Sequence, residues 1–126
     1  MREFRIVVPN ESGQLSQVAK VLADGGVNLR AFTGLTFGNE ALLAIVPDDA
    51  DKARAALHSL GLVVREVEIA HARVEDRPGA VAEITRKLTE AGVNLDTTYL
   101  MKCDSEFHIC FTSSDLPGLR RVLGIP

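Results

Sequence analysis

The sequence predicts an α+β protein of two tandem βαββαβ modules, in which each antiparallel sheet carries helices on one face and the second module lacks its last strand. Two observations predict this fold class. One segment of the chain occurs twice at a fixed spacing. In each copy the period of the hydrophobic residues also changes from that of a strand to that of a helix and back. We expect the modules to span residues 1–66 and 67–126.

The composition is that of a globular protein. Hydrophobic residues make up 46% and charged residues 25% of the 126 residues, which is enough apolar material for a packed core. The formal net charge of −3 gives no positive field that would attract the phosphates of a nucleic acid. The N-terminal sequence has no apolar run long enough for a signal peptide or a membrane span. We therefore expect a cytoplasmic protein with no nucleic-acid or membrane partner.

The repeat is clearest around a glycine and a Gly-Val-Asn-Leu tetrapeptide. Gly13 corresponds to Gly79 and Asn28 corresponds to Asn94, each 66 positions later. Because the glycine and the tetrapeptide are equally far apart in both copies, the helix between them should have the same length in both. Two copies of one unit therefore explain the sequence better than one mixed domain.

A strand and a helix open each copy. The strand is marked by alternating apolar residues, which are Phe4, Ile6 and Val8 in the first copy and, less regularly, Val67, Ile69, Ala72 and Val74 in the second. The helix is marked by apolar residues at helical spacing, which are Leu15, Val18, Ala19 and Leu22, then Val81, Ile84 and Leu88. Gly25-Gly26 and Gly92 end these helices.

Two further strands and a second helix follow in each copy. We expect the strands at residues 28–37 and 41–47 and at residues 94–102 and 106–113, each pair joined by a short polar turn. Helical spacing returns in Ala53, Ala56, Leu57 and Leu60, and again in Leu116, Leu119 and Leu123. Leu62-Val63-Val64 should form the closing strand of the first copy. With right-handed crossovers, this order gives a ferredoxin-like sheet with two helices on one face.

Two features of the predicted sheets call for a partner surface. Because the second module lacks its last strand, one edge of its sheet is exposed, and a sister module or another chain would have to cover it. Residues 42–46, Leu-Leu-Ala-Ile-Val, are apolar on both faces of their strand, although helices can cover only one. We therefore expect a homodimer.

Two segments of the second copy carry a resemblance to a known family. They are residues 74–81, Val-Glu-Asp-Arg-Pro-Gly-Ala-Val, and residues 91–95, Ala-Gly-Val-Asn-Leu. The sequence resembles the ACT domain family, small ligand-binding modules of regulated amino-acid-metabolism enzymes and of free-standing regulators, in its Asx-x-Pro-Gly turn and the start of its second strand. The resemblance covers nearly the whole chain, although the first copy has Ser12 where the family has proline.

The resemblance implies a ligand cleft where the loop after the first strand of one module faces the second strand of a neighbouring module. In family members that bind amino acids, the Asx and the glycine of this loop and the asparagine that opens the second strand contact the ligand. The residues at these positions here are Asn10, Gly13, Asn28, Asp76, Gly79 and Asn94. Asp76 departs from the pattern, since an amide is often found at its position.

Elementary chemistry points to the same loops. A glycine at the start of a helix lets a ligand approach the backbone, and the free N–H groups of the first helical turn favour a carboxylate. The amides of Asn28 and Asn94 offer both a donor and an acceptor. The alternative is a purely structural role, because Asx and glycine are also ordinary residues of helix caps and turns.

The sequence offers little material for catalysis. The three His residues form no nucleophile and base pair at short spacing, and neither GxGxxG nor GxxxxGK occurs to hold a phosphate. Asn28 with Arg30 is the one faint candidate for a phosphate site. Cys103 and Cys110 flank His108 without a CxxC pair, so we expect structural thiols and no metal.

The sequence therefore predicts a non-enzyme without a cofactor, a regulatory or sensor protein that binds an amino acid between modules. The alternative is a non-catalytic regulatory subunit that acts by protein-protein interaction with an enzyme of amino-acid metabolism.

Overall fold

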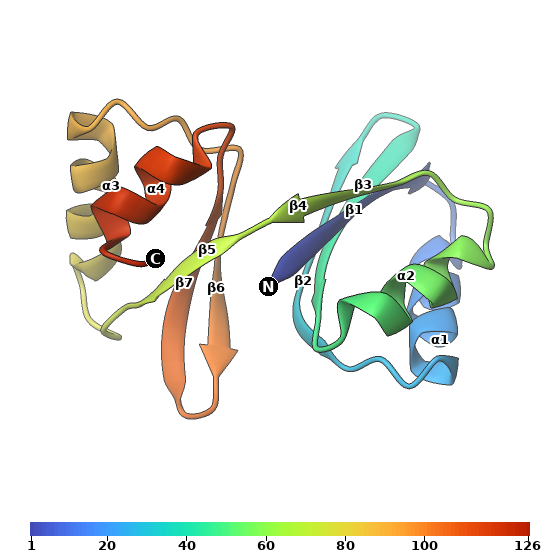
Figure 1. The fold of residues 1–126 in the computed structure, drawn as a ribbon. Helices are drawn as coiled ribbons and strands as arrows, with labels where there is room; N and C mark the ends of the chain where they lie inside the picture. The colour runs from blue at the N-terminus through green and yellow to red at the C-terminus, as the bar shows by residue number, and fades with distance from the viewer. The chain divides into compact units, whose positions relative to one another are not determined.

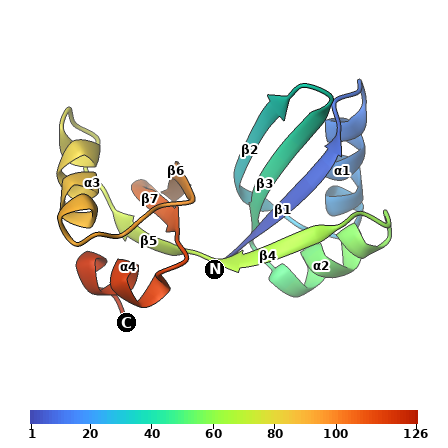
Figure 2. The ribbon, with the colours of Figure 1, turned by 90° about the horizontal axis from the view of Figure 1, so that it is seen from above.

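The computed structural model describes residues 1–126 and divides them into two compact units, Met1–Val67 and Glu68–Pro126. Each unit is an antiparallel sheet with two helices on one face (Figure 1). The view from above shows the two layers of each unit, with α1 and α2 on the first sheet and α3 and α4 on the second (Figure 2). The predicted α+β class, with two tandem modules of helices on an antiparallel sheet, is confirmed.

The first unit has the order of elements that the sequence predicts. Its elements are β1 (Arg2–Pro9), α1 (Gln14–Asp24), β2 (Leu29–Phe37), β3 (Glu40–Pro47), α2 (Ala50–His58) and β4 (Val64–Glu68). The strands form a sheet in the order β2-β3-β1-β4, which leaves β2 at one edge. Pairing of Phe37 and of Pro9 with Glu40 brings the β2–β3 hairpin beside the loop that follows β1.

The second unit repeats this arrangement with one strand fewer. Its elements are β5 (Ala70–Arg73), α3 (Ala80–Glu90), β6 (Thr97–Cys103), β7 (Glu106–Thr112) and α4 (Leu116–Leu123). The sheet has three strands in the order β5-β7-β6. The second module therefore lacks its last strand, as predicted.

Each unit has a hydrophobic core formed by its own residues. In the first, the buried residues come from the predicted alternating strand and the predicted helix faces: Phe4, Ile6, Val8, Val18, Val27, Leu22, Leu43, Ile45, Ala53 and Leu57. In the second they are Ala70, Leu88, Val93, Ile109, Phe111 and Leu119. Periodicity therefore identified most of the core, because alternate strand residues and every third or fourth helix residue share one face.

The predicted closing strand of the first unit is wrong in position. Leu62-Val63-Val64 was expected to pair, but β4 begins only at Val64 and Val63 is 87% exposed. Gly61, with φ of 65°, turns the chain after α2, and Leu62 packs on the core as part of the loop. The apolar character of residues 62–64 partly reflects the packing of Leu62, a loop residue, on the core. It does not mark a strand.

Two other strand limits also differ from the sequence-based ranges. Val67 belongs to β4, so the first strand of the second unit starts at Ala70. The strand expected from Asn94 starts at Thr97, where the ladder with Thr112 begins. In both cases the residues before the strand resemble those within it. Only backbone pairing therefore defines where the strand begins.

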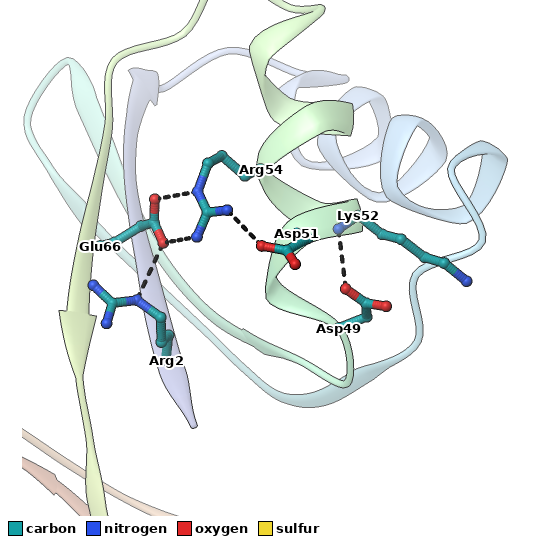
Figure 3. Close-up of polar contacts among 6 residues, drawn as sticks. All are labelled: Arg2, Asp49, Asp51, Lys52, Arg54 and Glu66. Atoms are coloured by element: carbon teal, nitrogen blue, oxygen red, sulfur yellow. Dashed lines mark hydrogen bonds and ion pairs between the residues drawn. The ribbon is translucent and has the colours of Figure 1, made fainter.

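Strand β4 is attached to α2 and β1 by a charged cluster of Glu66, Arg54 and Arg2 (Figure 3). Arg54 donates from Nε and Nη2 to the two carboxylate oxygens of Glu66, at 2.7 and 2.6 Å. Arg2 Nε donates to Oε1 at 3.2 Å. These hydrogen bonds, from Arg54 above all, hold the pKa of the Glu66 carboxyl below its usual value.

None of the four helices is long and apolar enough to cross a membrane.

Candidate ligand-binding site

The helices that begin at the two predicted loops differ from the other two in how they start. Gly13 precedes α1 and Gly79 precedes α3, and neither helix has a side-chain cap. By contrast, Asp49 accepts a hydrogen bond from the Lys52 N–H at the start of α2 (Figure 3). Asp115 does the same for α4. The first N–H group of each helix, of Gln14 and of Ala80, donates to a carbonyl of its loop. No side chain caps the rest of the first turn, so its N–H groups are left to solvent or a ligand at the two loops that the sequence singled out.

The two loop glycines share one backbone conformation. Their φ angles are 91° at Gly13 and 90° at Gly79, in the left-handed region that only glycine adopts freely. A Cβ at Gly13 would meet no atom within 4 Å, and one at Gly79 would meet only the Arg77 guanidinium, at 3.8 Å. The positive φ favours glycine at both positions, and the space where a Cβ would lie is open.

Asn10 has a structural contact in this loop. Its side-chain amide donates to the carbonyl of Gly38 at 3.1 Å, and its backbone N–H donates to the carbonyl of Asn39 at 2.7 Å. Both bonds tie the loop after β1 to the β2–β3 hairpin. Asp76 is at the same place in the second unit. Its carboxyl side chain has no N–H group, so it cannot repeat this contact.

A pocket of about 300 Å³ lies beside this loop in the first unit. Val8, Leu43 and Ala41 contribute apolar walls from the sheet, and Leu15 contributes one from the first turn of α1. Asn10, Glu11, Gln14 and Thr36 bring polar groups, and Gly34 and Leu35 of β2 complete the lining. Apolar walls with a few polar groups are typical of sites for small molecules, and this volume is at the small end of their range.

The predicted asparagines Asn28 and Asn94 lie elsewhere in their units. Asn28 precedes β2 at the end where Leu29 pairs with Pro47, which is the opposite end of the sheet from the hairpin. Its backbone N–H donates to the carboxylate of Asp48 at 3.0 Å. Asn94 accepts a hydrogen bond from Ser113 Oγ through its carbonyl. A single unit therefore does not bring the asparagine and the loop together.

Both asparagines are exposed and use their backbone in these contacts. A shallow pocket of about 290 Å³ lies next to Asn28, lined by Arg30 and Asp48 among others. The faint phosphate candidate therefore lies at an open pocket that Arg2 and Arg30 share with the Asp48 carboxylate, which accepts the hydrogen bond from Asn28.

The loop of the second unit carries a charged cluster in place of the apolar pocket. Arg77 donates to Glu75 at 2.6 Å and to Glu83, in the first turn of α3, at 2.9 Å. Hydrogen bonding to Arg77 keeps the pKa of the Glu83 carboxyl below its usual value. The pocket there, of about 200 Å³, is lined by these charged groups and by Lys87.

Sequence reasoning predicted the strand that lines the pocket but not its part in the site. Gly34 and Leu35 in the middle of β2 and Glu11 and Gln14 beside the loop were not singled out, although a glycine inside a strand pattern is a signal for close approach or open space.

The residues considered for catalysis or metal binding do not form such a site. His71 and His108 are adjacent, with 3.0 Å between their Nδ1 atoms. Cys103 is partly buried and Cys110 is buried, and both are free thiols. No three His, Cys, Asp or Glu side chains converge as metal ligands would.

The sequence matches the family described as ACT domain pair over residues 1–116. No protein with a curated description matches the chain. Among solved structures, protein BT0572 from Bacteroides thetaiotaomicron is 25% identical, with a TM-score of 0.88 over 98% of this chain and 85% of that one.

The regulatory subunit of aspartate kinase from Thermus thermophilus, solved without ligand, has the same fold. It is 15% identical, with a TM-score of 0.71 over 98% of this chain and 89% of that one. The corresponding subunit from Thermus flavus is 18% identical, with a TM-score of 0.65 over 98% of this chain and 89% of that one.

Proposed function

The chain belongs to the ACT domain pair family, and we propose that it is a non-catalytic regulatory protein that binds a free amino acid. The observation that carries this proposal is the pocket beside the uncapped start of α1. The free N–H groups there suit the carboxylate that every amino acid has, and the pocket offers apolar space for a side chain. The family and the regulatory subunits that share the fold support a regulatory role.

The full site needs a second module. Asn10 and Gly13 lie at one end of their unit and Asn28 at the other, so we propose that the asparagine of a neighbouring module completes the polar contacts of the ligand. The same division applies to Asp76, Gly79 and Asn94. The sequence predicts contacts at all six positions, and in each module the glycine loop would lie nearest to the carboxylate of a ligand.

We propose that the neighbouring module comes from a second copy of the chain. β2 is an edge strand, and three apolar side chains on the sheet face opposite the helices are exposed: Val7 by 51%, Leu35 by 53% and Phe37 by 70%. Such a cluster next to an unpaired edge is typical of an interaction surface.

Titration calorimetry of the full chain with each common amino acid tests the proposal. We expect binding of one of them below millimolar concentration. Asn28→Ala or Asn94→Ala should weaken it about tenfold or more, because a hydrogen bond to a charged group contributes about 1.5–3 kcal/mol. Asn39→Ala, in the hairpin turn, is the matched control and should bind as the wild type does. Absence of any amino-acid binding to the folded wild type contradicts the proposal.

A second candidate is a regulatory subunit that acts by contact with an enzyme of amino-acid metabolism. The exposed Val7, Leu35 and Phe37 also suit a protein partner. Thermal denaturation separates the two, because a ligand that binds only the folded chain raises its midpoint. A purely protein-binding subunit shows no such rise with any amino acid.

A further inference from the structure

The edge strands of the two modules carry different residues at the position of Gly34. Gly34 of β2 pairs with Leu43 of β3, and Leu100 of β6 pairs with Ile109 of β7. Both residues of the second pair lie 66 positions after those of the first. Leu43 and Ile109 are core residues beneath the helices. Gly34 and Leu100 therefore hold the same place on the helix-facing side of their sheets.

The backbone does not require a glycine at position 34. Gly34 is not among the residues with positive φ, so its conformation is open to other residues. An added Cβ would lie 3.4 Å from Leu43 Cδ2 and 4.0 Å from Phe32 Cε1, which are ordinary contacts. Because Gly34 lines the pocket, any side chain there takes up part of the pocket. The missing side chain is what keeps this space open.

The charged groups around the two loops also favour ligand binding at the first loop over the second. Glu11 lines the pocket and makes no ion pair, whereas its counterpart Arg77 is bound by Glu75 and Glu83. The first turn of α1 holds no acidic residue, whereas that of α3 holds Glu83. The first loop thus offers a free carboxylate for an ammonium group and free N–H groups for a carboxylate.

We propose that only the first module binds the ligand, and that the ligand is an amino acid with an apolar side chain that fills the space left by Gly34. This inference rests on the proposed function. The ligand carboxylate binds at the start of α1 and its ammonium group faces Glu11. Its side chain packs on Val8 and Leu43. In the second module the position of Gly34 is taken by Leu100, whose half-exposed side chain stands where the side chain of a ligand would enter.

Titration calorimetry of the full chain tests this with L-leucine, L-isoleucine, L-methionine and L-phenylalanine against L-serine, L-aspartate and L-lysine. We expect one site per chain and at least about tenfold tighter binding of an apolar amino acid. Gly34→Leu copies the second module and should weaken binding by about thirtyfold or more. Leu100→Ala is the matched control and should change the affinity less than about threefold. Glu11→Gln should weaken binding about tenfold.

The variants are first checked for cooperative thermal unfolding. Gly34→Val, a residue that suits an edge strand, replaces Gly34→Leu if the leucine variant does not fold, and about tenfold weaker binding is expected. Two outcomes would show that the assignment to the first module is wrong while the proposed function stands. In the first, the wild type and the folded Gly34 variant bind an amino acid equally well. In the second, the wild type binds an amino acid and the Leu100→Ala variant does not. If the wild type binds serine, aspartate or lysine more tightly than the apolar amino acids, the proposed apolar ligand class is wrong. A wild type that binds no amino acid removes both proposals.

Discussion

Gly13 and Gly79 begin α1 and α3 in a conformation that a residue with a Cβ adopts only at a cost in free energy. Nothing crowds a Cβ at Gly13, so the cost there is purely conformational. Asn10 complements Gly13, because its side-chain amide fixes the loop to the carbonyl of Gly38. At the scale of residues, the loop is therefore a structured turn that also presents free N–H groups. The structural and ligand-binding interpretations of these residues are compatible.

Gly13→Ala is expected to lower the free energy of unfolding by about 1–2 kcal/mol, because alanine has to adopt a left-handed φ. Gly34→Ala is the matched control. Its φ is unrestricted and its Cβ makes ordinary contacts, so the variant should be as stable as the wild type or more stable by about 0.5 kcal/mol. Urea denaturation measures both. Equal stability of the two variants would mean that the φ of Gly13 imposes no requirement for glycine.

At the scale of elements, β4 combines pairing with β1, partial packing of Val64 on the core and a charged cluster. None of its residues is buried, yet Glu66 accepts three hydrogen bonds from Arg54 and Arg2, which come from α2 and β1. Paired hydrogen bonds between a guanidinium and a carboxylate are stronger and more directional than a single contact. This cluster adds side-chain contacts to the backbone pairing that places β4 beside β1.

Glu66→Gln is expected to lower the free energy of unfolding by about 1 kcal/mol at pH 7, a modest value because Arg54 is about half exposed. The pKa of Glu66 is lowered in the folded protein, so its contribution is present above the unfolded pKa. The difference from the wild type should therefore shrink as the pH falls from about 4.5 through the lower folded pKa.

Urea denaturation at a series of pH values measures this difference. Glu11→Gln is the control, because Glu11 is exposed and makes no ion pair, so the substitution should change the free energy of unfolding little. A Glu66→Gln difference that stays the same down to pH 2 would show that the ion pair does not cause it.

At the scale of the whole molecule, the exposed apolar residues of the first sheet predict self-association. Val7 and Leu35 both flank Leu42 in the sheet register, and Phe37 lies at the end of the same edge strand. Apolar side chains gathered in this way are more stable when another surface covers them.

Phe37→Glu is expected to weaken the homodimer about tenfold or more, because burying an unpaired charge in an apolar contact is costly. Analytical ultracentrifugation over the micromolar range measures the dissociation constant. Val63→Glu is the matched control, since Val63 is 87% exposed and lies in the loop before β4. A wild type that is monomeric throughout this range, or a Phe37→Glu variant that associates as the wild type does, contradicts the proposed surface.

The sequence alone determined the order of elements, the two modules, the missing strand and most core residues, because hydrophobic period and glycine conformation are local properties of the chain. It also located the Gly13 and Gly79 turns. Only the tertiary structure decided where β4 begins, since Glu66 is fixed by Arg54 and Arg2 from distant segments.

The tertiary structure likewise decided which predicted site residues lie together. Asn10 and Asn28 are at opposite ends of one sheet, a consequence of strand register that neighbouring residues do not reveal. The pocket exists because Gly34 comes to lie beside the loop and α1, and its counterpart is Leu100. A missing side chain becomes a binding space only when segments far apart in the sequence form the walls around it, which is why the repeat could locate the loops but not distinguish the two modules.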